Sequence, residues 1–171
     1  FMRAATARHM RLAPGAHVHM PPAPDRALLL YIHVPFCEVL CPFCSFHRVR
    51  FERERAERHF GALRREIALY HAHGYRFDAV YVGGGTPTVL PAQLAATLDY
   101  VRRLYPIRQT SVETNPDHLT HEVLDRLADA GVDRLSVGVQ SFDDDLLRGM
   151  QRYDKYGSGA QILAGLARAH G

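Results

Sequence analysis

Beyond residue 26, short apolar runs alternate along the chain with longer segments in which apolar residues recur every three or four positions. Short apolar runs bounded by glycine or proline are typical of buried strands, and the three-to-four spacing is typical of amphipathic helices. The runs predict strands at residues 27–34, 77–82, 110–114 and 134–139. The longer segments predict helices at residues 52–73, 91–105 and 120–130, with further short helices starting near Asp143 and Ser158.

Local signals at the ends of these segments agree with the predicted helices. Gly74 and Gly131 follow the first and third helical segments, where a glycine often ends a helix. Pro91 falls in the first turn of the second helix, where proline is tolerated because its missing N–H would be unpaired anyway. Thr120 is placed to cap the third helix at its amino terminus.

Four successive β-α units predict an α/β fold, with a parallel sheet, right-handed crossovers and helices packed outside it. A complete eight-unit barrel needs about 250 residues, and this chain has 171. It ends after a helix, where a fifth strand should follow. We therefore expect a partial parallel (β/α) barrel of about four units, truncated before closure, in which the strand at residues 134–139 keeps an unpaired apolar edge.

The chain is expected to have one folded domain preceded by a flexible lead-in. Residues 13–25 contain four prolines and one glycine, a composition typical of irregular segments. We assign residues 1–25 to the lead-in and residues 26–171 to an incomplete core domain.

Composition narrows the classes of protein that this chain fits. Apolar residues make up 47%, charged residues 23%, and the net charge is +3, as in ordinary soluble globular proteins. The most charged run, residues 51–60, mixes both signs at i,i+4 spacing and indicates a solvated helix face, so nucleic acid is not an expected partner. The longest apolar run is far shorter than the roughly 20 residues of a membrane span, and no secretory signal is evident. We expect a cytoplasmic protein without a membrane partner.

The three cysteines of the chain, Cys37, Cys41 and Cys44, lie within eight residues. If three thiolates hold a four-iron cluster, one iron has no protein ligand and is open to a small molecule. A Cys3His zinc site, completed by His33 or His47, fits the same cysteines. The odd count disfavours a disulfide framework. Burial as plain apolar residues does not explain three so close together.

Unusual residues also follow the other predicted strands, and barrel enzymes place their reactive groups at the carboxyl ends of strands. Gly83–Gly85 follow the second strand, Glu113 closes the third and Gln140 closes the fourth. Together with the cysteines after the first strand, these groups are expected to meet on one rim.

Each of these groups suits a bound nucleoside but also has a plainer interpretation. The glycines admit close approach of a ligand to the backbone, or they form a tight turn; they do not match a dinucleotide or phosphate-loop motif. Glu113 offers a carboxylate to vicinal ribose hydroxyls, or it is a surface acid. Gln140 suits an adenine or carboxylate edge, or caps a loop. Arg152 offers a forked cation to a ligand carboxylate, or it is a solvated surface arginine.

Three blocks resemble the radical S-adenosylmethionine enzymes: Tyr31–Cys44, Gly83–Thr88 and Arg134–Phe142. Within that superfamily the chain is most similar to the oxygen-independent coproporphyrinogen III oxidase family, over residues 28 to about 155. This resemblance favours the iron–sulfur cluster over zinc. It implies that Cys37, Cys41 and Cys44 hold a [4Fe-4S] cluster whose open iron binds S-adenosylmethionine.

The resemblance also implies which residues contact the cofactor. Tyr31, Gly85 and Glu113 match positions that contact S-adenosylmethionine, and Gly84 is assigned to the cofactor-binding residues with them. A second set matches positions that, in the oxidase, surround a second S-adenosylmethionine: Phe43, Thr86, Pro87, Gln140 and Arg152.

The implied activity is one-electron reductive cleavage of S-adenosylmethionine to methionine and a 5′-deoxyadenosyl radical. In the oxidase, this radical takes hydrogen from the propionate side chains of coproporphyrinogen III. The implied partners are a tetrapyrrole substrate or heme, and an electron donor such as a flavodoxin or ferredoxin. Phe46 departs from the oxidase, which has another cysteine there, so the alternative is a heme chaperone or heme-binding relative without oxidase activity. We expect these 171 residues alone to be inactive.

Overall fold

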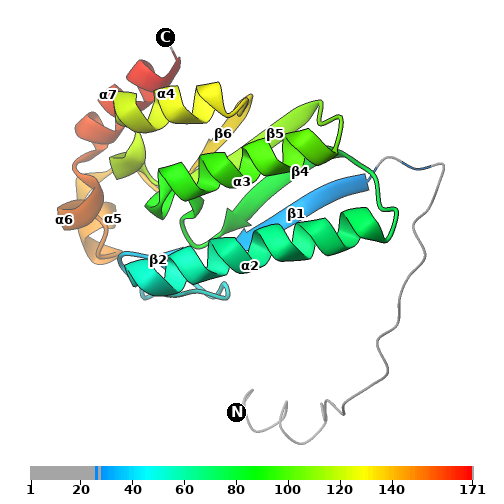
Figure 1. Ribbon diagram of the computed structural model, residues 1–171. Coiled ribbons are helices and arrows are strands. Elements are labelled where there is room, and N and C mark those ends of the chain that lie inside the picture. Colours follow the sequence, from blue (N-terminus) through cyan, green and yellow to red (C-terminus); the bar gives the residue numbers. More distant parts are fainter. Residues whose placement is uncertain (1–25, 27, 171) are drawn as a thin grey trace, which may run out of the picture.

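The computed structural model describes residue 26 and residues 28–170, so the lead-in predicted at residues 1–25 lies outside the described part. Its main sheet has four strands in the order β1-β4-β5-β6, and every neighbouring pair is parallel (Figure 1). The predicted α/β fold with a four-stranded parallel sheet is confirmed. The strands are β1 (Leu28–Val34), β4 (Phe77–Gly84), β5 (Gln109–Thr114) and β6 (Arg134–Val137).

Long helices connect the successive strands, and Figure 1 shows α2 and α3 side by side across the sheet. The connecting helices are α2 (Arg53–Ala72), α3 (Pro91–Leu104) and α4 (His121–Asp129). The other helical elements of the described part are two 3-10 turns and three further helices: η1 (Pro87–Val89), η2 (Pro116–His118), α5 (Asp144–Gly149), α6 (Tyr153–Tyr156) and α7 (Gly159–His170). Among the described residues, no helix combines the length and the apolar character that crossing a bilayer requires.

The predicted helix ends are found close to their expected positions. Thr120 caps α4, its hydroxyl accepting a hydrogen bond from the Val123 N–H, and Asp143 caps α5 through the Leu146 N–H. Gly131 follows the last residues of α4 with a φ of +73°, a conformation that glycine adopts without the strain that a Cβ causes. The helix boundaries are therefore set by local sequence.

The two faces of the sheet differ because successive side chains of a strand point in opposite directions. On β1, Leu30, Ile32 and Val34 are buried, whereas Leu29 and Tyr31 are exposed. The buried set joins Val80 and Val82 of β4, Val112 of β5 and the inner faces of α2 and α3 in one core (Leu30, Ile32, Val34, Ala56, Phe60, Ile67, Val80, Val82, Leu94, Leu98, Val101, Val112). The opposite face of the sheet does not contribute to this core, and its side chains are available for a functional site.

A second, very small sheet was not predicted. Strand β2 (Phe36–Cys37) pairs in parallel with β3 (Val49–Arg50). The Val49 N–H donates to the Pro35 carbonyl at 2.8 Å, and the Phe51 N–H donates to the Cys37 carbonyl at 2.8 Å. Both ends of the cysteine-bearing loop, residues 38–48, are therefore held by backbone hydrogen bonds.

The fourth strand of the main sheet is shorter than predicted. Strand β6 ends at Val137, two residues before the expected end at Val139. The Gly138 N–H still donates to the Thr114 carbonyl, but the Val139 N–H turns back to the Val137 carbonyl. Gln140 therefore lies beyond the strand in a loop. The prediction that Gln140 closes the fourth strand is wrong.

Candidate functional site

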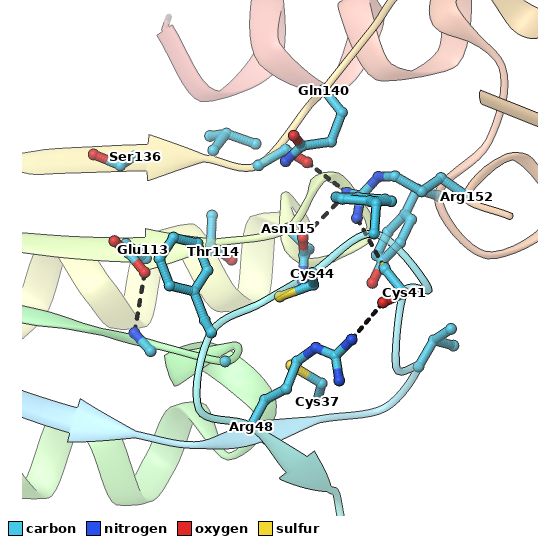
Figure 2. A pocket seen from close by; sticks show the side chains of 18 of the residues that line it. Cys37, Cys41, Cys44, Arg48, Glu113, Thr114, Asn115, Ser136, Gln140 and Arg152 are labelled. Atoms are coloured by element: carbon cyan, nitrogen blue, oxygen red, sulfur yellow. Dashed lines mark hydrogen bonds between the residues drawn. The ribbon is translucent and has the colours of Figure 1, made fainter. Parts of the chain in front are cut away.

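The carboxyl ends of the strands surround a cavity of about 460 Å³ (Figure 2). Its walls come from the cysteine loop, the glycine turn after β4, the end of β5, the segment after β6 and helix α6. The predicted site residues that line it are Cys37, Phe43, Gly84, Gly85, Glu113, Gln140, Arg152 and the other two cysteines, Cys41 and Cys44. The convergence of strand ends expected from the sequence is thus observed.

All three cysteines are free and face this cavity. Cys37 ends β2, and Cys41 and Cys44 lie in the turn that follows, where the Cys44 N–H donates to the Cys41 carbonyl at 3.2 Å. Cys37 and Cys41 are buried, and Cys44 is half-buried. Burial raises the pKa of the Cys37 thiol, and a hydrogen bond from Thr86 opposes that rise. Because thiols must lose their protons to bind a metal, cations near this loop favour ligation.

The glycine turn fits closely against the first cysteine. A Cβ at Gly85 would lie 2.8 Å from Cys37 Sγ and 2.6 Å from the Phe36 carbonyl oxygen. No side chain can occupy that position unless the backbone moves. The turn is held there because the Gly85 N–H donates to the Val34 carbonyl and the Thr86 N–H donates to the Phe36 carbonyl. The glycine is required for close packing on the cysteine loop.

The distances between the three thiols help to distinguish a zinc site from an iron–sulfur cluster site. Zinc with Zn–S bonds of about 2.3 Å brings tetrahedral ligand sulfurs within about 4 Å of one another. In the described part of the chain, the metal-type ligand groups within 4.8 Å of one another are Glu38, Asp117 and His118, and no cysteine belongs to such a group. At least one pair of the three sulfurs is therefore more than 4.8 Å apart, a spacing that favours thiolates on a larger iron–sulfur cluster over a compact zinc site.

Glu113 is fixed on the cavity wall by two protein donors. The Tyr81 hydroxyl donates to Glu113 Oε1 at 2.5 Å, and the Gly84 N–H donates to Oε2 at 3.1 Å. The hydrogen bond with Glu113 raises the pKa of Tyr81 to about 12. Each carboxylate oxygen can accept a further hydrogen bond. A pair of ligand hydroxyls could therefore bind this oriented carboxylate.

Arg152 is buried, with 3% of its surface exposed, so the surface interpretation of this residue is wrong. Its guanidinium donates to Cys41 Sγ at 3.4 Å, to Asn115 Oδ1 at 3.3 Å and to the Gly138 carbonyl at 2.5 Å. It also lies over the Tyr156 ring, with 3.9 Å from Cζ to the ring centroid. Arg152 thus connects α6, the end of β5 and the cysteine loop.

Gln140 lines the cavity from a backbone conformation that is uncommon for a residue with a side chain. Its φ is +70°, in the left-handed region that costs most non-glycine residues energy. Such conformations persist where the surrounding structure holds them, and they gather at functional sites. The turn directs Gln140 toward the cavity instead of continuing the strand.

Three of the predicted cofactor contacts do not line this cavity. Tyr31 is 51% exposed, its hydroxyl is 2.9 Å from His33 Nδ1, and it lines a separate hollow between β1 and α2. Thr86 and Pro87 are buried behind the cysteines. Thr86 donates to Cys37 Sγ at 3.8 Å and accepts from the Asn115 amide at 2.7 Å. Their contacts with S-adenosylmethionine stay predictions.

Several cavity residues were missed in the sequence. Asn115 links Thr86 to Arg152, and its position directly after a strand was a usable signal. Arg48 enters the cavity from the residue before β3, and Tyr156 from α6. Neither lies at the end of a main-sheet strand, so nothing in the strand pattern pointed to them.

An ionic network ties the cysteine loop to the carboxyl-terminal helices. Lys155 Nζ lies 2.7 Å from Glu38 Oε2 and 2.9 Å from Asp117 Oδ2. His118 Nε2 is 3.3 Å from the same Glu38 oxygen. Burial favours the neutral form of Glu38, but the hydrogen bonds and charges of Lys155 and His118 together outweigh it and lower the pKa of that carboxyl. Because Glu38 follows Cys37 directly, the network anchors the loop next to its first thiol.

Comparison with known proteins identifies the superfamily to which this chain belongs. The sequence profile of the radical SAM superfamily matches residues 31–170. The match covers most of the chain, and the protein belongs to this superfamily. Membership implies a [4Fe-4S] cluster and S-adenosylmethionine as cofactors. The residues present fit them: three free thiols face one cavity, and Gly85 leaves no room for a side chain beside Cys37.

Several curated relatives of this chain have a tetrapyrrole in their names. The chain is 39% identical over 132 residues to the heme chaperone HemW of Bacillus subtilis, covering 73% of this chain and 35% of HemW. It is 35% identical over 137 residues to the oxygen-independent coproporphyrinogen III oxidase of Escherichia coli K12, covering 75% and 30%. It is 34% identical over 139 residues to the anaerobilin synthase of Escherichia coli O157:H7, covering 76% and 31%. The chain spans about a third of the length of these relatives.

The fold is similar to that of a solved relative. The coproporphyrinogen III oxidase HemN of Escherichia coli, a radical SAM enzyme, superimposes with a TM-score of 0.75 and 31% identity over 86% of this chain and 35% of that one. The resemblance predicted from the three sequence blocks is confirmed.

Proposed function

We propose that this chain binds a [4Fe-4S] cluster through Cys37, Cys41 and Cys44 and acts on a tetrapyrrole, as an oxygen-independent coproporphyrinogen III oxidase-like protein. The observation that carries the proposal is the shared cavity. The three thiols, the backbone of Gly84 and Gly85, and the Glu113 carboxylate face one space. Coproporphyrinogen oxidases among the relatives support the tetrapyrrole as substrate class.

When bound, the cluster supplies one electron for the reductive cleavage of S-adenosylmethionine to a 5′-deoxyadenosyl radical. The chain's own residues bind and orient the reactants. Glu113, held by Tyr81 and Gly84, would accept hydrogen bonds from the ribose hydroxyls. Gln140 and Phe43, which line the same cavity, belong to the set that matches positions around a second S-adenosylmethionine, and they would contact that molecule. The electron comes from a small carrier protein such as a flavodoxin or ferredoxin.

Anaerobic reconstitution of the full chain tests the cofactor assignment first. We expect about four iron and four sulfide per chain, the content of one [4Fe-4S] cluster, and a reduced-cluster electron paramagnetic resonance (EPR) signal that changes when S-adenosylmethionine is added. Cys41→Ser should lose the cluster, since it removes one of three thiolate ligands. A parent protein that takes up zinc in place of iron would reject the assignment.

A second function, heme chaperone, is favoured by Phe46. This side chain is 75% exposed and lines the cavity, and the oxidase family has a cysteine at the matching position. The similarity to HemW of Bacillus subtilis supports the same alternative. In this role the protein binds heme near the cluster and does not turn over coproporphyrinogen.

Two assays on the same preparation separate these functions. Release of 5′-deoxyadenosine that depends on coproporphyrinogen III supports the oxidase-like proposal. Stoichiometric binding of heme supports the chaperone, because this readout does not depend on turnover by the 171 residues, which are expected to be inactive alone. Phe46→Cys is the informative variant, because it restores the oxidase pattern at one position and leaves the three ligands in place.

A further inference from the structure

Arg48 reaches the cysteine site from an unexpected direction. It lies four residues after Cys44 and directly before β3, and its side chain lines the cavity that the thiols face. The pairing of β3 with β2 brings this residue beside the strand that carries Cys37. Figure 2 shows its guanidinium between the Cys37 side chain and the Cys41 backbone.

The guanidinium of Arg48 has few protein partners. Nη2 donates a hydrogen bond to the Cys41 carbonyl. Nε is buried and has no hydrogen-bond partner among the described residues. Arg152, which also lines the cavity, likewise has an Nε without a partner among the described residues, but it uses both Nη groups on Cys41 Sγ, Asn115 and Gly138. Arg48 therefore combines a positive charge with unused donor capacity inside the cavity.

The charges around the thiols give Arg48 a physical role. Arg48 is a permanent cation in the cavity that the three thiols face, and its guanidinium lies beside the Cys37 side chain. Three thiolates repel one another, and reduction of a bound cluster adds another negative charge. Net charge and hydrogen bonding near a cluster set its reduction potential, and a cation close by stabilises the more negative state.

We propose that Arg48 is a positioning residue that stabilises the reduced iron–sulfur cluster, by fixing a positive charge in the cavity that the three thiolates face while it donates a hydrogen bond to the Cys41 carbonyl. This inference rests on the cofactor assignment above. The charge is the essential part, because a neutral side chain of similar length would keep the packing and lose the electrostatic stabilisation.

The test compares Arg48→Met, Arg48→Lys and the control Arg58→Met in the full chain, reconstituted without oxygen. Arg58 is an exposed arginine on α2, paired with Glu54, and does not line the cavity. A redox titration followed by EPR measures the reduced fraction. For Arg48→Met we expect about a tenfold lower ratio of reduced to oxidised cluster at a fixed potential, a shift of about 59 mV for one electron. Arg48→Lys and Arg58→Met should stay near the parent value.

An unchanged potential in a fully loaded Arg48→Met variant overturns the proposal. If that variant folds like the parent by circular dichroism but holds no cluster, Arg48→Lys decides. A lysine variant that regains the cluster at the parent potential supports the charge role, and one that fails in the same way overturns it. A parent protein without a cluster would instead reject the cofactor assignment, so the two failures are distinguishable.

Discussion

The guanidinium of Arg152 donates to Cys41 Sγ at 3.4 Å, although 111 residues separate the two in sequence. Arg152 lies at the start of α6, and Cys41 lies in the loop between β2 and β3. The contact joins the last part of the described chain to the first. It also places a permanent cation against one of the three thiols.

Replacing Arg152 by methionine should weaken both the fold and the metal site. The change leaves the Gly138 carbonyl and Asn115 Oδ1 without a charged donor in a half-buried position. Hydrogen bonds from charged groups are worth about 1.5–3 kcal/mol, and we expect a loss of about that size in the free energy of unfolding of the metal-free protein, measured with urea. Iron content after reconstitution should also fall.

Arg152→Lys is the matched variant, because it keeps the charge but lacks the planar fork. It should recover part of the stability and not all of it. Unfolding free energies equal to the parent for both variants would show that the buried contacts contribute nothing.

Alanine at Gly85 should prevent cluster binding. The added Cβ would lie 2.6 Å from the Phe36 carbonyl oxygen and 2.8 Å from Cys37 Sγ, so the turn and the cysteine loop must move apart. We expect iron uptake to drop severely while the far-UV circular dichroism spectrum is retained. Gly149→Ala is the control, since its Cβ meets nothing within 4 Å and alanine favours helix by up to about 1 kcal/mol. Normal iron uptake by Gly85→Ala would contradict the close packing.

Replacing Tyr81 by phenylalanine should leave the Glu113 carboxylate less firmly oriented, because the Tyr81 hydroxyl donates a hydrogen bond to it. The lost hydrogen bond to Glu113 is expected to cost about 1 kcal/mol, which is about a fivefold weaker affinity for S-adenosylmethionine. Isothermal titration with the reconstituted chain measures this effect. Glu113→Ala should keep the cluster and weaken the same affinity further. An unchanged affinity in both variants would mean that the ribose lies elsewhere.

The same hydrogen bond predicts a pH dependence. The pKa of Tyr81 is raised from 10.0 to about 12 in the folded protein, so the folded state holds this proton more tightly than the unfolded state does. The resulting stability is complete below pH 10 and is lost as the pH rises through about 12. Parent and Tyr81→Phe unfolding curves should therefore converge with rising alkaline pH. A stability difference that stays constant up to pH 12 would contradict this.

Methionine at Lys155 should release the ligand loop from the carboxyl-terminal helices. It leaves the Glu38 and Asp117 carboxylates facing each other without their shared cation. We expect a loss of about 1–2 kcal/mol in unfolding free energy, between the values for exposed and buried ion pairs, and faster release of iron to a chelator. Arg53→Met, which breaks the exposed pair with Glu57, should cost less than about 0.5 kcal/mol. Equal losses in the two variants would refute the anchoring role.

The order of strands and helices could be predicted from the sequence because it follows local periodicity. The inner residues of α3, Leu94, Leu98 and Val101, are buried as their spacing indicated. Caps such as Thr120 are also local, since a side chain bonds a backbone group three residues away. The meeting of the cysteines, glycines and Glu113 was predictable because parallel strands bring their carboxyl ends to one edge.

The remaining features depend on contacts between distant segments. The end of β6 at Val137 involves the Gly138 carbonyl, which accepts from Arg152, and no local signal marks that contact. The burial of Arg152 and the entry of Arg48 into the cavity arise from packing of the loop and helices. Tyr31 is conspicuous in the motif, yet its ring stacks on Tyr81 at 6.0 Å between centroids and does not line the cavity.

The small β2–β3 sheet determines the stage at which the cysteine loop loses its conformational freedom. Backbone hydrogen bonds at Val49 and Phe51 close the loop during folding of the polypeptide itself, so the entropy of closure is not lost again at metal uptake. We therefore expect iron to meet a narrow ensemble, in which both ends of the cysteine loop are already fixed. The protein emptied by oxygen damage should therefore keep its shape and accept a new cluster without refolding.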